Sequence, residues 1–355
     1  MVAYRLPSVG QGIELDRRCP YCGRNGSNIH SGVRWRPVRD IRIQRVLQRR
    51  MKCPYCHSTW TLRCKGVEPG RQRTQRLLGM GVLLYMLGLS YRSVEAFLRC
   101  MDCPAGKSTV ERDVTEAGQK ARVLHREAPR MRVRILGVDG TGDARAGAKG
   151  GLLFYVDIER QKLLLVEPLQ ESDTAKVRRH VRRVLQKVGA EELRTDEHSV
   201  YRGIGADRRH RICLTHWRKS KGKRAWDILQ QAKREERLLE ARTMQELLEL
   251  LRLKPRPPTP PEDLERLVRR YINARKGLAW KVNQLLQHVE RTWERVSDDP
   301  LDPTNNVTER LIGLTFKIRS KTMRGFKADR KIQAHPYLSS FLRGQGGVCH
   351  LESVL

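Results

Sequence analysis

Three acidic residues that lie far apart in the sequence could together bind divalent metal ions. Asp139 ends the apolar run VRILGVD, Asp196 ends the short run LRTD, and Glu309 shares a helical face with Ile312 and Phe316. If the two runs form neighbouring parallel strands, about 4.8 Å apart, both aspartates emerge at one end of a sheet. Packing of the helix onto that sheet would bring the third carboxylate to the same place.

Carboxylates that meet in this way suit a centre with two metal ions. Their hard, anionic oxygens are the ligands that Mg²⁺ or Mn²⁺ prefers. Two such ions, roughly 3.5 to 4 Å apart, can activate a water or a DNA 3′-hydroxyl and stabilise the leaving oxygen of a displacement at phosphorus. We therefore predict phosphoryl transfer, with these three acids as catalytic metal ligands. The substitutes, if the strand ends differ by a few residues, are Asp143, Glu197 and Asp302.

Each acid also has a purely structural interpretation. Asp139 precedes a glycine and could form a turn, Asp196 could cap the short helix that follows, and Glu309 could be the partner of an Asn306 cap. Their order along the chain, at a first strand, a fourth strand and a last helix, is the order that one folded site requires. This order favours the metal site.

Two identical CPYC runs predict a second, structural metal site. Zinc takes four thiolates tetrahedrally, and each C-x-x-C turn offers two of them. The total of nine cysteines is odd, and the N-terminus does not resemble a signal peptide, so ligation is favoured over disulfides. His57 and Cys64 lie close enough to replace one ligand, and unligated buried cysteines are the other interpretation. The predicted zinc ligands are Cys19, Cys22, Cys53 and Cys56.

The chain is strongly basic, which predicts a polyanionic partner. Lys and Arg number 71 against 39 Asp and Glu, a net charge of +32. A membrane surface is the weaker alternative, because the chain has no lipidation signal and no long apolar segment. Residues 1–76 alone hold 17 Lys and Arg against 4 Asp and Glu, so we expect the zinc module to touch DNA phosphates.

A helical region should follow the zinc module. Helices are expected over residues 71–87, 90–98 and 108–121, the last opened by a capping box of Ser108 and Glu111. They could form a helix-turn-helix whose last helix enters the major groove, or a plain helical bundle. The predicted core consists of Leu83, Leu87, Val94, Phe97, Val110 and Val114. The candidate DNA contacts are Lys107, Arg112 and Lys120.

The central region should form a mixed sheet. Three runs, at residues 133–139, 152–159 and 162–169, predict an antiparallel meander. A helix capped by Ser172 or Asp173 and ended by Gly189 should cross over to two parallel strands, at residues 193–196 and 211–214. This is the order of a ribonuclease-H-like core with a mixed five-stranded sheet and flanking helices.

Prolines and composition predict the remaining boundaries. Charged, mostly helical sequence, broken by KPRPPTPPE, should form an all-α insertion within the core. The predicted segments are a zinc ribbon (1–70), a helix-turn-helix (71–128), the first part of the core (129–214), the helical insertion (215–300), the last core helix with a basic tail (301–345) and a C-terminal tail (346–355).

Four sequence blocks carry a family resemblance. VDGT, LRTDEHSVYRG, CLTHW and TNNVTERLIGLTFKIRSKTMRGF resemble blocks of insertion-sequence and Mutator-like DDE transposases, over about residues 130–330. The resemblance implies Asp139, Asp196 and Glu309 as the metal ligands, and Cys213 with His216 as the C-x-x-H pair of such enzymes. A buried strand-end cysteine and a helix-start histidine are the alternative for that pair.

The resemblance also implies partners. A transposase would bind terminal inverted repeats and target DNA, and because two ends must be brought together, we expect a homodimer or larger assembly. Because the N-terminus does not resemble a signal peptide, we expect a cytoplasmic protein that is nucleoid-associated when bound to DNA. A ribonuclease-H-like nuclease or resolvase without strand transfer, and a non-enzymatic DNA-binding regulator, remain the rival functions.

Trp217 and Trp226 could stack on an unpaired base or belong to a core. Cations that could position phosphates near Glu309 are Lys317, Arg319, Lys321, Arg324 and Lys327.

Overall fold

Contacts divide the chain into two compact units. The structure is a computed structural model that describes residues 3–10, 18–24, 29–127, 132–141, 151–204, 209–296, 306–322, 329–344 and 348–355. The first unit comprises Met1–Ala128 with Thr315–Leu355, and the second comprises Pro129–Leu314. Within the described ranges, every helix is too short or too polar to span a bilayer.

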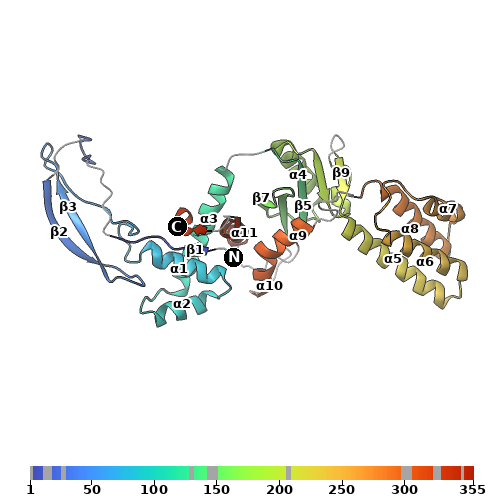
Figure 1. The fold of residues 1–355 in the computed structure, drawn as a ribbon, viewed down its shortest axis with the longest axis horizontal. Helices are drawn as coiled ribbons and strands as arrows, with labels where there is room; N and C mark the ends of the chain where they lie inside the picture. The colour runs from blue at the N-terminus through green and yellow to red at the C-terminus, as the bar shows by residue number, and fades with distance from the viewer. Residues whose placement is uncertain are drawn as a thin grey trace. The chain divides into compact units, whose positions relative to one another are not determined.

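The first unit combines small sheets with helices (Figure 1). Strands β2, β3 and β4 form an antiparallel sheet, and β1 pairs in parallel with β10. The elements are β1 (Ala3–Arg5), β2 (Ile29–Pro37), β3 (Arg45–Lys52), β4 (Thr59–Thr61), α1 (Gln75–Met86), α2 (Tyr91–Cys100), α3 (Lys107–Glu127), α10 (Ile318–Thr322), α11 (Asp329–Gly344), β10 (Val348–His350) and the 3-10 turn η3 (Leu351–Val354).

Local capping explains where the first helices begin. Thr74 caps α1 by accepting a hydrogen bond from the amide of Leu77, and Ser90 caps α2 in the same way. The predicted capping box at Ser108 is wrong, because α3 begins at Lys107, one residue earlier. The amide of Lys107 instead donates to a carboxyl oxygen of Glu95 at 3.1 Å.

The core of these helices differs in part from the prediction. Val94, Val110 and Val114 are buried as expected, but Leu87 is 62% exposed and Phe97 is 40% exposed. The reason is that each helix turns a different set of positions toward the core than the sequence suggested. The inward faces are formed instead by Leu77, Val82, Tyr85 and Leu98.

A fourth helix, α11, packs against α3. The approach is close, because a Cβ atom on Gly118 would lie 2.6 Å from the Cβ atom of Ala334. This contact places the chain from Thr315 onward with the N-terminal helices, whereas we had expected residues 301–345 to belong to the core. The six predicted segments remain a prediction.

The second unit contains the predicted mixed sheet. Its strand order is β7-β6-β5-β8-β9, in which β5, β6 and β7 are antiparallel and β8 and β9 run parallel to β5. The elements are β5 (Ile135–Thr141), β6 (Leu152–Asp157), β7 (Lys162–Glu167), α4 (Thr174–Val188), β8 (Glu192–Thr195), the 3-10 turn η1 (Ser199–Tyr201), β9 (Arg209–Ile212) and α9 (Asn306–Ile312), followed by the π-helical turn η2 (Gly313–Lys317).

The crossover helix α4 has the predicted ends. Asp173 caps its first turn, and Gly189 ends it in the left-handed conformation, with φ of 62°. The prediction of a mixed five-stranded sheet with flanking helices is therefore confirmed.

A helical region follows β9 in the second unit. Its helices are α5 (Leu214–Arg234), α6 (Leu238–Arg252), α7 (Glu262–Tyr271) and α8 (Gly277–Trp293), with the proline-rich stretch between α6 and α7. Trp217 lies in the core of this region, where its indole nitrogen donates to Thr292 Oγ1 at 2.8 Å. Of the two interpretations of Trp217, the structure therefore supports the one in which it belongs to a core. Trp226, by contrast, is exposed.

Candidate metal centres

The four cysteines of the CPYC runs form one compact cluster. Their sulfur atoms all lie within 4.8 Å of one another, with 3.6 Å between Cys19 and Cys56 and 3.7 Å between Cys22 and Cys53. Tetrahedral zinc with Zn–S bonds of about 2.3 Å separates its sulfur ligands by about 3.8 Å. The cluster therefore suits a structural Zn²⁺ ion.

The two C-x-x-C turns share one backbone conformation. The amide of Gly23 donates to the carbonyl of Cys19 at 2.9 Å, and the amide of His57 donates to that of Cys53 at 3.0 Å. Gly23 and His57 both have positive φ, of 70° and 58°. His57 thus occupies the turn position that glycine takes in the first run, and lies outside the sulfur cluster.

Cys64 also lies outside the cluster. Its thiol points to the carbonyl of Leu47 at 3.5 Å, and it is buried with Val38, Val46 and Val67. The cluster that could hold zinc therefore consists of the four predicted sulfurs, without His57 or Cys64.

Two of the predicted acids lie on or next to neighbouring parallel strands. Strands β5 and β8 pair in parallel with Gly137 opposite Arg194. Asp139 lies within β5, which continues to Thr141 rather than ending at Asp139 as predicted, and Asp196 is the first residue after β8. Asp139 is buried and Asp196 is half-buried.

Glu309 comes to this sheet on α9, which contacts β5 and β6. The approach requires a glycine in β5, because a side chain at Gly137 would collide with Oγ1 of Thr308. The carboxylate of Glu309 meets the imidazole of His216, with 2.9 Å between Oε1 and Nε2.

His216 carries positive charge into this region. Interaction with the Cys213 side chain, followed by the negative charges of Glu309 and Asp139, raises its pKa to about 9. Cys213 directly precedes α5, and its amide donates to the carbonyl of Thr195 at 2.9 Å, next to Asp196. The C-x-x-H pair thus lies among the predicted acids.

A fourth acid, Glu171, lies beside the same strand and was missed. Its carboxylate accepts a hydrogen bond from the Tyr201 hydroxyl at 2.6 Å. A Cβ atom on Gly140 would come within 2.7 Å of its Oε1 atom. Burial, and then the negative charges of Glu171, Asp196 and Asp139, strongly raise the pKa of Tyr201. Glu171 lies in a loop, where no periodic pattern of residues could have predicted its position. The one sequence feature that could have indicated a close neighbour at this strand was the glycine after Asp139, Gly140.

Glu197 is held by the helical region. Lys221 Nζ lies 2.6 Å and His288 Nε2 lies 2.5 Å from its carboxyl oxygens. Burial alone would raise its pKa, but the hydrogen bonds from His288 and Lys221 lower the pKa of Glu197 below its usual value. These contacts account for Glu197 without a metal. The other two substitutes, Asp143 and Asp302, lie outside the described residues.

The carboxylates do not form a compact metal cluster. Among the residues that the structure describes, only the four cysteines bring three or more potential ligand atoms within 4.8 Å of one another. Glu309 is paired with His216 instead. The assignment of Asp139, Asp196 and Glu309 to magnesium therefore remains a prediction.

Known proteins provide no family assignment. No protein-family model matches the chain, and no curated protein matches it. The likeness to DDE transposases thus rests on the four sequence blocks alone.

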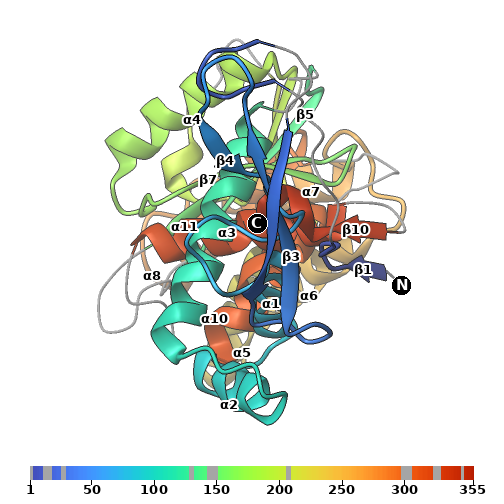
Figure 2. The same cartoon turned by 90° about the vertical axis from the view of Figure 1, so that its left-hand side faces the viewer.

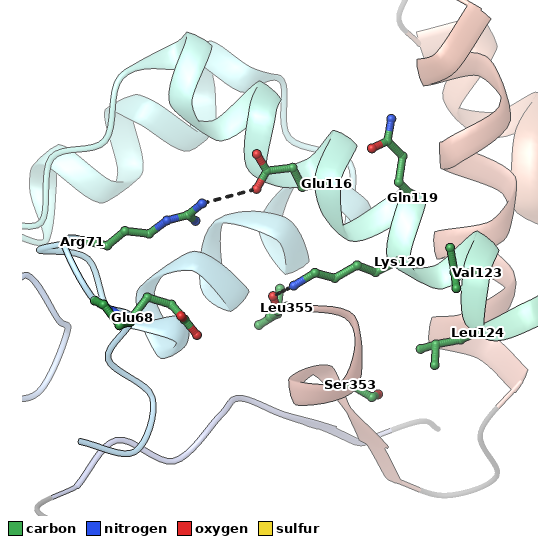
Figure 3. A pocket seen from close by; sticks show the side chains of 10 residues that line it. Glu68, Arg71, Glu116, Gln119, Lys120, Val123, Leu124, Ser353 and Leu355 are labelled. Atoms are coloured by element: carbon green, nitrogen blue, oxygen red, sulfur yellow. Dashed lines mark hydrogen bonds and ion pairs between the residues drawn. The ribbon is translucent and has the colours of Figure 1, made fainter. Parts of the chain in front are cut away.

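The predicted DNA contacts of α3 are exposed, but two have partners within the protein. Arg112 lies 3.9 Å from Glu116, and Lys120 donates to the carbonyl of Leu355. Figure 3 shows Lys120, Glu116 and Leu355 around a pocket of about 640 Å³. Lys107 is exposed at the start of the helix.

The cations after Glu309 are placed differently from one another. Lys317 is half-buried, and Arg319 is buried, with its guanidinium donating to the carbonyls of Gly88 and Leu89 at 2.5 and 2.6 Å. The same group lies 4.2 Å from the ring centroid of Tyr85, so packing within the first unit accounts for Arg319. The side chain of Lys321, together with Arg324 and Lys327, lies outside the described residues.

Proposed function

We propose that the chain is a DNA transposase, in which Asp139, Asp196 and Glu309 hold two magnesium or manganese ions. The observation that carries the proposal is the placement of the acids. Asp139 lies in β5, Asp196 directly follows the neighbouring parallel strand β8, and Glu309 lies on α9, which packs against β5. The oxygen donor set is the one that these ions prefer.

The protein's own residues would perform complementary tasks. His216 Nε2 lies 2.9 Å from Glu309 Oε1 and would orient that carboxylate. Tyr201 holds the Glu171 carboxylate beside β5 through its hydrogen bond. The bound ions would supply activation of the attacking oxygen and stabilisation of the leaving oxygen at phosphorus. The net positive charge of the chain would hold the DNA in place.

Cleavage of DNA tests this proposal. The zinc-loaded chain is incubated with Mg²⁺ and labelled DNA that carries the sequences flanking its own coding region. We expect nicking by the parent and its loss in Asp139→Asn, Asp196→Asn and Glu309→Gln. Glu191→Gln, an exposed acid just before β8, is the matched control and should cut like the parent. The assignment is wrong if the three variants cut as well as the parent does.

A joined product separates transposition from simple hydrolysis. A transposase transfers the new 3′-hydroxyl into a second DNA, whereas a nuclease or resolvase leaves only cut strands. Detection of labelled DNA covalently joined to an unlabelled target would support the transposase. Cleavage without joining would support the ribonuclease-H-like nuclease.

One observation favours a second function, binding of DNA without cleavage. The described carboxylates do not form a metal cluster, and Glu309 is neutralised by His216. A regulator built on the cysteine cluster and the helices would have both properties. Such a protein would bind DNA tightly and leave it uncut at every Mg²⁺ concentration.

A further inference from the structure

Strands β2 and β3 form a long antiparallel ribbon, and the short strand β4 pairs with the end of β3, at Arg50–Lys52 (Figures 1 and 2). The register pairs Val33 with Arg49, Trp35 with Leu47 and Pro37 with Arg45. Side chains alternate between the two faces of a strand, so these residues share one face. We call it the ribbon face, and it consists of Val33, Trp35, Pro37, Arg45, Leu47 and Arg49.

The opposite side of the ribbon is already covered. Val46 and Gln48 are buried there, and Val46 packs with Cys64 and Val67. On the ribbon face, by contrast, Val33 is 56% exposed and Trp35 is 52% exposed. The ribbon face therefore displays apolar surface that the protein itself leaves in solvent.

The charge of the ribbon indicates the chemistry of its partner. The two strands contain six cations and no acid, and two of the cations, Arg45 and Arg49, lie on the ribbon face. Among the residues that the structure describes, none of the six forms an ion pair with a carboxylate. The guanidinium of Arg45 lies 4.7 Å from the ring centroid of Trp35. The six cations are Arg34, Arg36, Arg45, Arg49, Arg50 and Lys52.

Helix α3 is less suited to the same partner. Two of its acids form ion pairs with nearby cations. Glu111 pairs with Lys331, and Glu116 pairs with Arg71 and Arg112. The exposed charge of α3 is thus partly cancelled, whereas that of the ribbon is not.

Both ends of the ribbon are held in place. At one end Cys53, the residue after β3, belongs to the cysteine cluster. At the other end Asp40, in the turn between the strands, pairs with Arg76 at 2.9 Å and accepts a hydrogen bond from Thr74. A ribbon held at both ends loses little conformational entropy when it binds.

We infer that the ribbon face binds double-stranded DNA by lying in the major groove. The part of the ribbon away from β4 has two strands, and a two-stranded ribbon fits that groove, which is about 12 Å wide. A nine-residue strand extends about 30 Å, close to one turn of the duplex. Arg45 and Arg49 reach phosphates, and Trp35 and Val33 contact the groove's apolar edges. This inference shares with the proposed function only the premise that duplex DNA is the partner.

Neighbouring arginines on opposite faces provide the test. Arg49→Ala and Arg50→Ala remove the same charge from adjacent residues of β3, but only Arg49 lies on the ribbon face. Binding of the zinc-loaded full chain to a 30-base-pair duplex of mixed sequence is measured by fluorescence anisotropy, without Mg²⁺. Zinc content and thermal melting of each variant confirm that it is folded.

We expect Arg49→Ala and Trp35→Ala each to weaken duplex binding by about tenfold, and Arg50→Ala by about twofold or less. Arg49→Ala should also reduce the slope of log affinity against log salt by about 0.9. Equal losses at Arg49 and Arg50, or no loss at Trp35, would overturn the inference. Preference for a single strand of the same sequence would also overturn it. Because no cleavage is needed, a chain that binds through the ribbon and never cuts would support this inference and contradict the proposed transposase.

Discussion

At the scale of single residues, Glu197 and Lys221 form a buried pair that joins the end of β8 to the helical region. Lys221 is 2% exposed, and burial lowers its pKa, while Glu197 holds it charged from 2.6 Å away. Lys221 without Glu197 would be a buried charge without its carboxylate, whereas Glu197 without Lys221 would keep only His288. The pair also lies one residue from Asp196, so it positions the loop of the candidate site.

Lys221→Met should therefore destabilise the second unit. Removing one partner of a buried ion pair costs about 3 to 5 kcal/mol. Chemical denaturation would measure the loss. Arg269→Met, which breaks an exposed pair with Glu265, is the control and should cost about 1 kcal/mol or less. Equal effects of the two substitutions would show that Lys221 is not buried as described.

The conformation of His57 leads to a prediction about zinc. Because His57 has the positive φ of Gly23 in the matching turn, His57→Gly should keep one zinc ion per chain. Cys53→Ser should lose most of it, since a thiolate ligand disappears. Elemental analysis of the purified variants measures both. Loss of zinc from His57→Gly would mean that the imidazole is a ligand.

At the scale of elements, two glycines provide a matched pair of helix substitutions. A methyl group at Gly118 would meet the side chain and backbone of Ala334 across the α3–α11 contact, whereas one at Gly222 in α5 would meet nothing within 4 Å. Gly118→Ala should cost about 1 to 3 kcal/mol of unfolding free energy by overpacking. Gly222→Ala should be neutral or stabilise by about 0.4 to 1 kcal/mol. Thermal and chemical denaturation would measure both, and a stable Gly118→Ala would contradict the packing of α11.

The burial of His335 in α11 predicts a pH dependence. Burial, and then the charge of Arg319, lower its pKa from 6.5 to about 3. The unfolded chain therefore binds this proton more tightly. The contribution of His335 to the free energy of unfolding is therefore complete above pH 6.5. It falls as the pH decreases toward 3, by at most about 1.4 kcal/mol per pH unit. His335→Phe should flatten this decline in urea denaturation series, and an unchanged slope would contradict the burial.

The sheet and its caps were predictable because their signals are local. The apolar runs of β5 to β9, the cap at Asp173 and the terminator Gly189 each lie within a few residues of the element that they define. The packing of α11 on α3 was not predictable, because it joins segments more than 200 residues apart. The hydrophobic pattern of a helix shows which face is buried, but not which helix packs against it.

The candidate site divides in the same way. The placement of Asp139 in β5 and of Asp196 just after the parallel strand β8 follows from the order of the strands. Glu171, Tyr201 and the pairing of Glu309 with His216 depend on side-chain contacts across the fold. No periodic pattern in the sequence encodes such contacts.

At the scale of the whole molecule, the excess of basic residues predicts a steep salt dependence. With 71 Lys and Arg against 39 Asp and Glu, DNA binding should release many counterions. A site with about 6 to 10 phosphate contacts loses about 10³ to 10⁵ in affinity between 50 and 200 mM salt. Anisotropy titrations over this range measure the slope, and a flat response would contradict binding through the basic surface.

The central claim is that Asp139, Asp196 and Glu309 hold catalytic metal ions, and Mn²⁺ binding tests it most directly. Electron paramagnetic resonance would count the Mn²⁺ ions bound by the zinc-loaded chain with duplex DNA present. The account predicts two ions per chain for the parent and for Glu191→Gln, and loss of at least one ion in Asp139→Asn. A parent that binds no Mn²⁺, or an Asp139→Asn variant that binds as many ions as the parent, would contradict it.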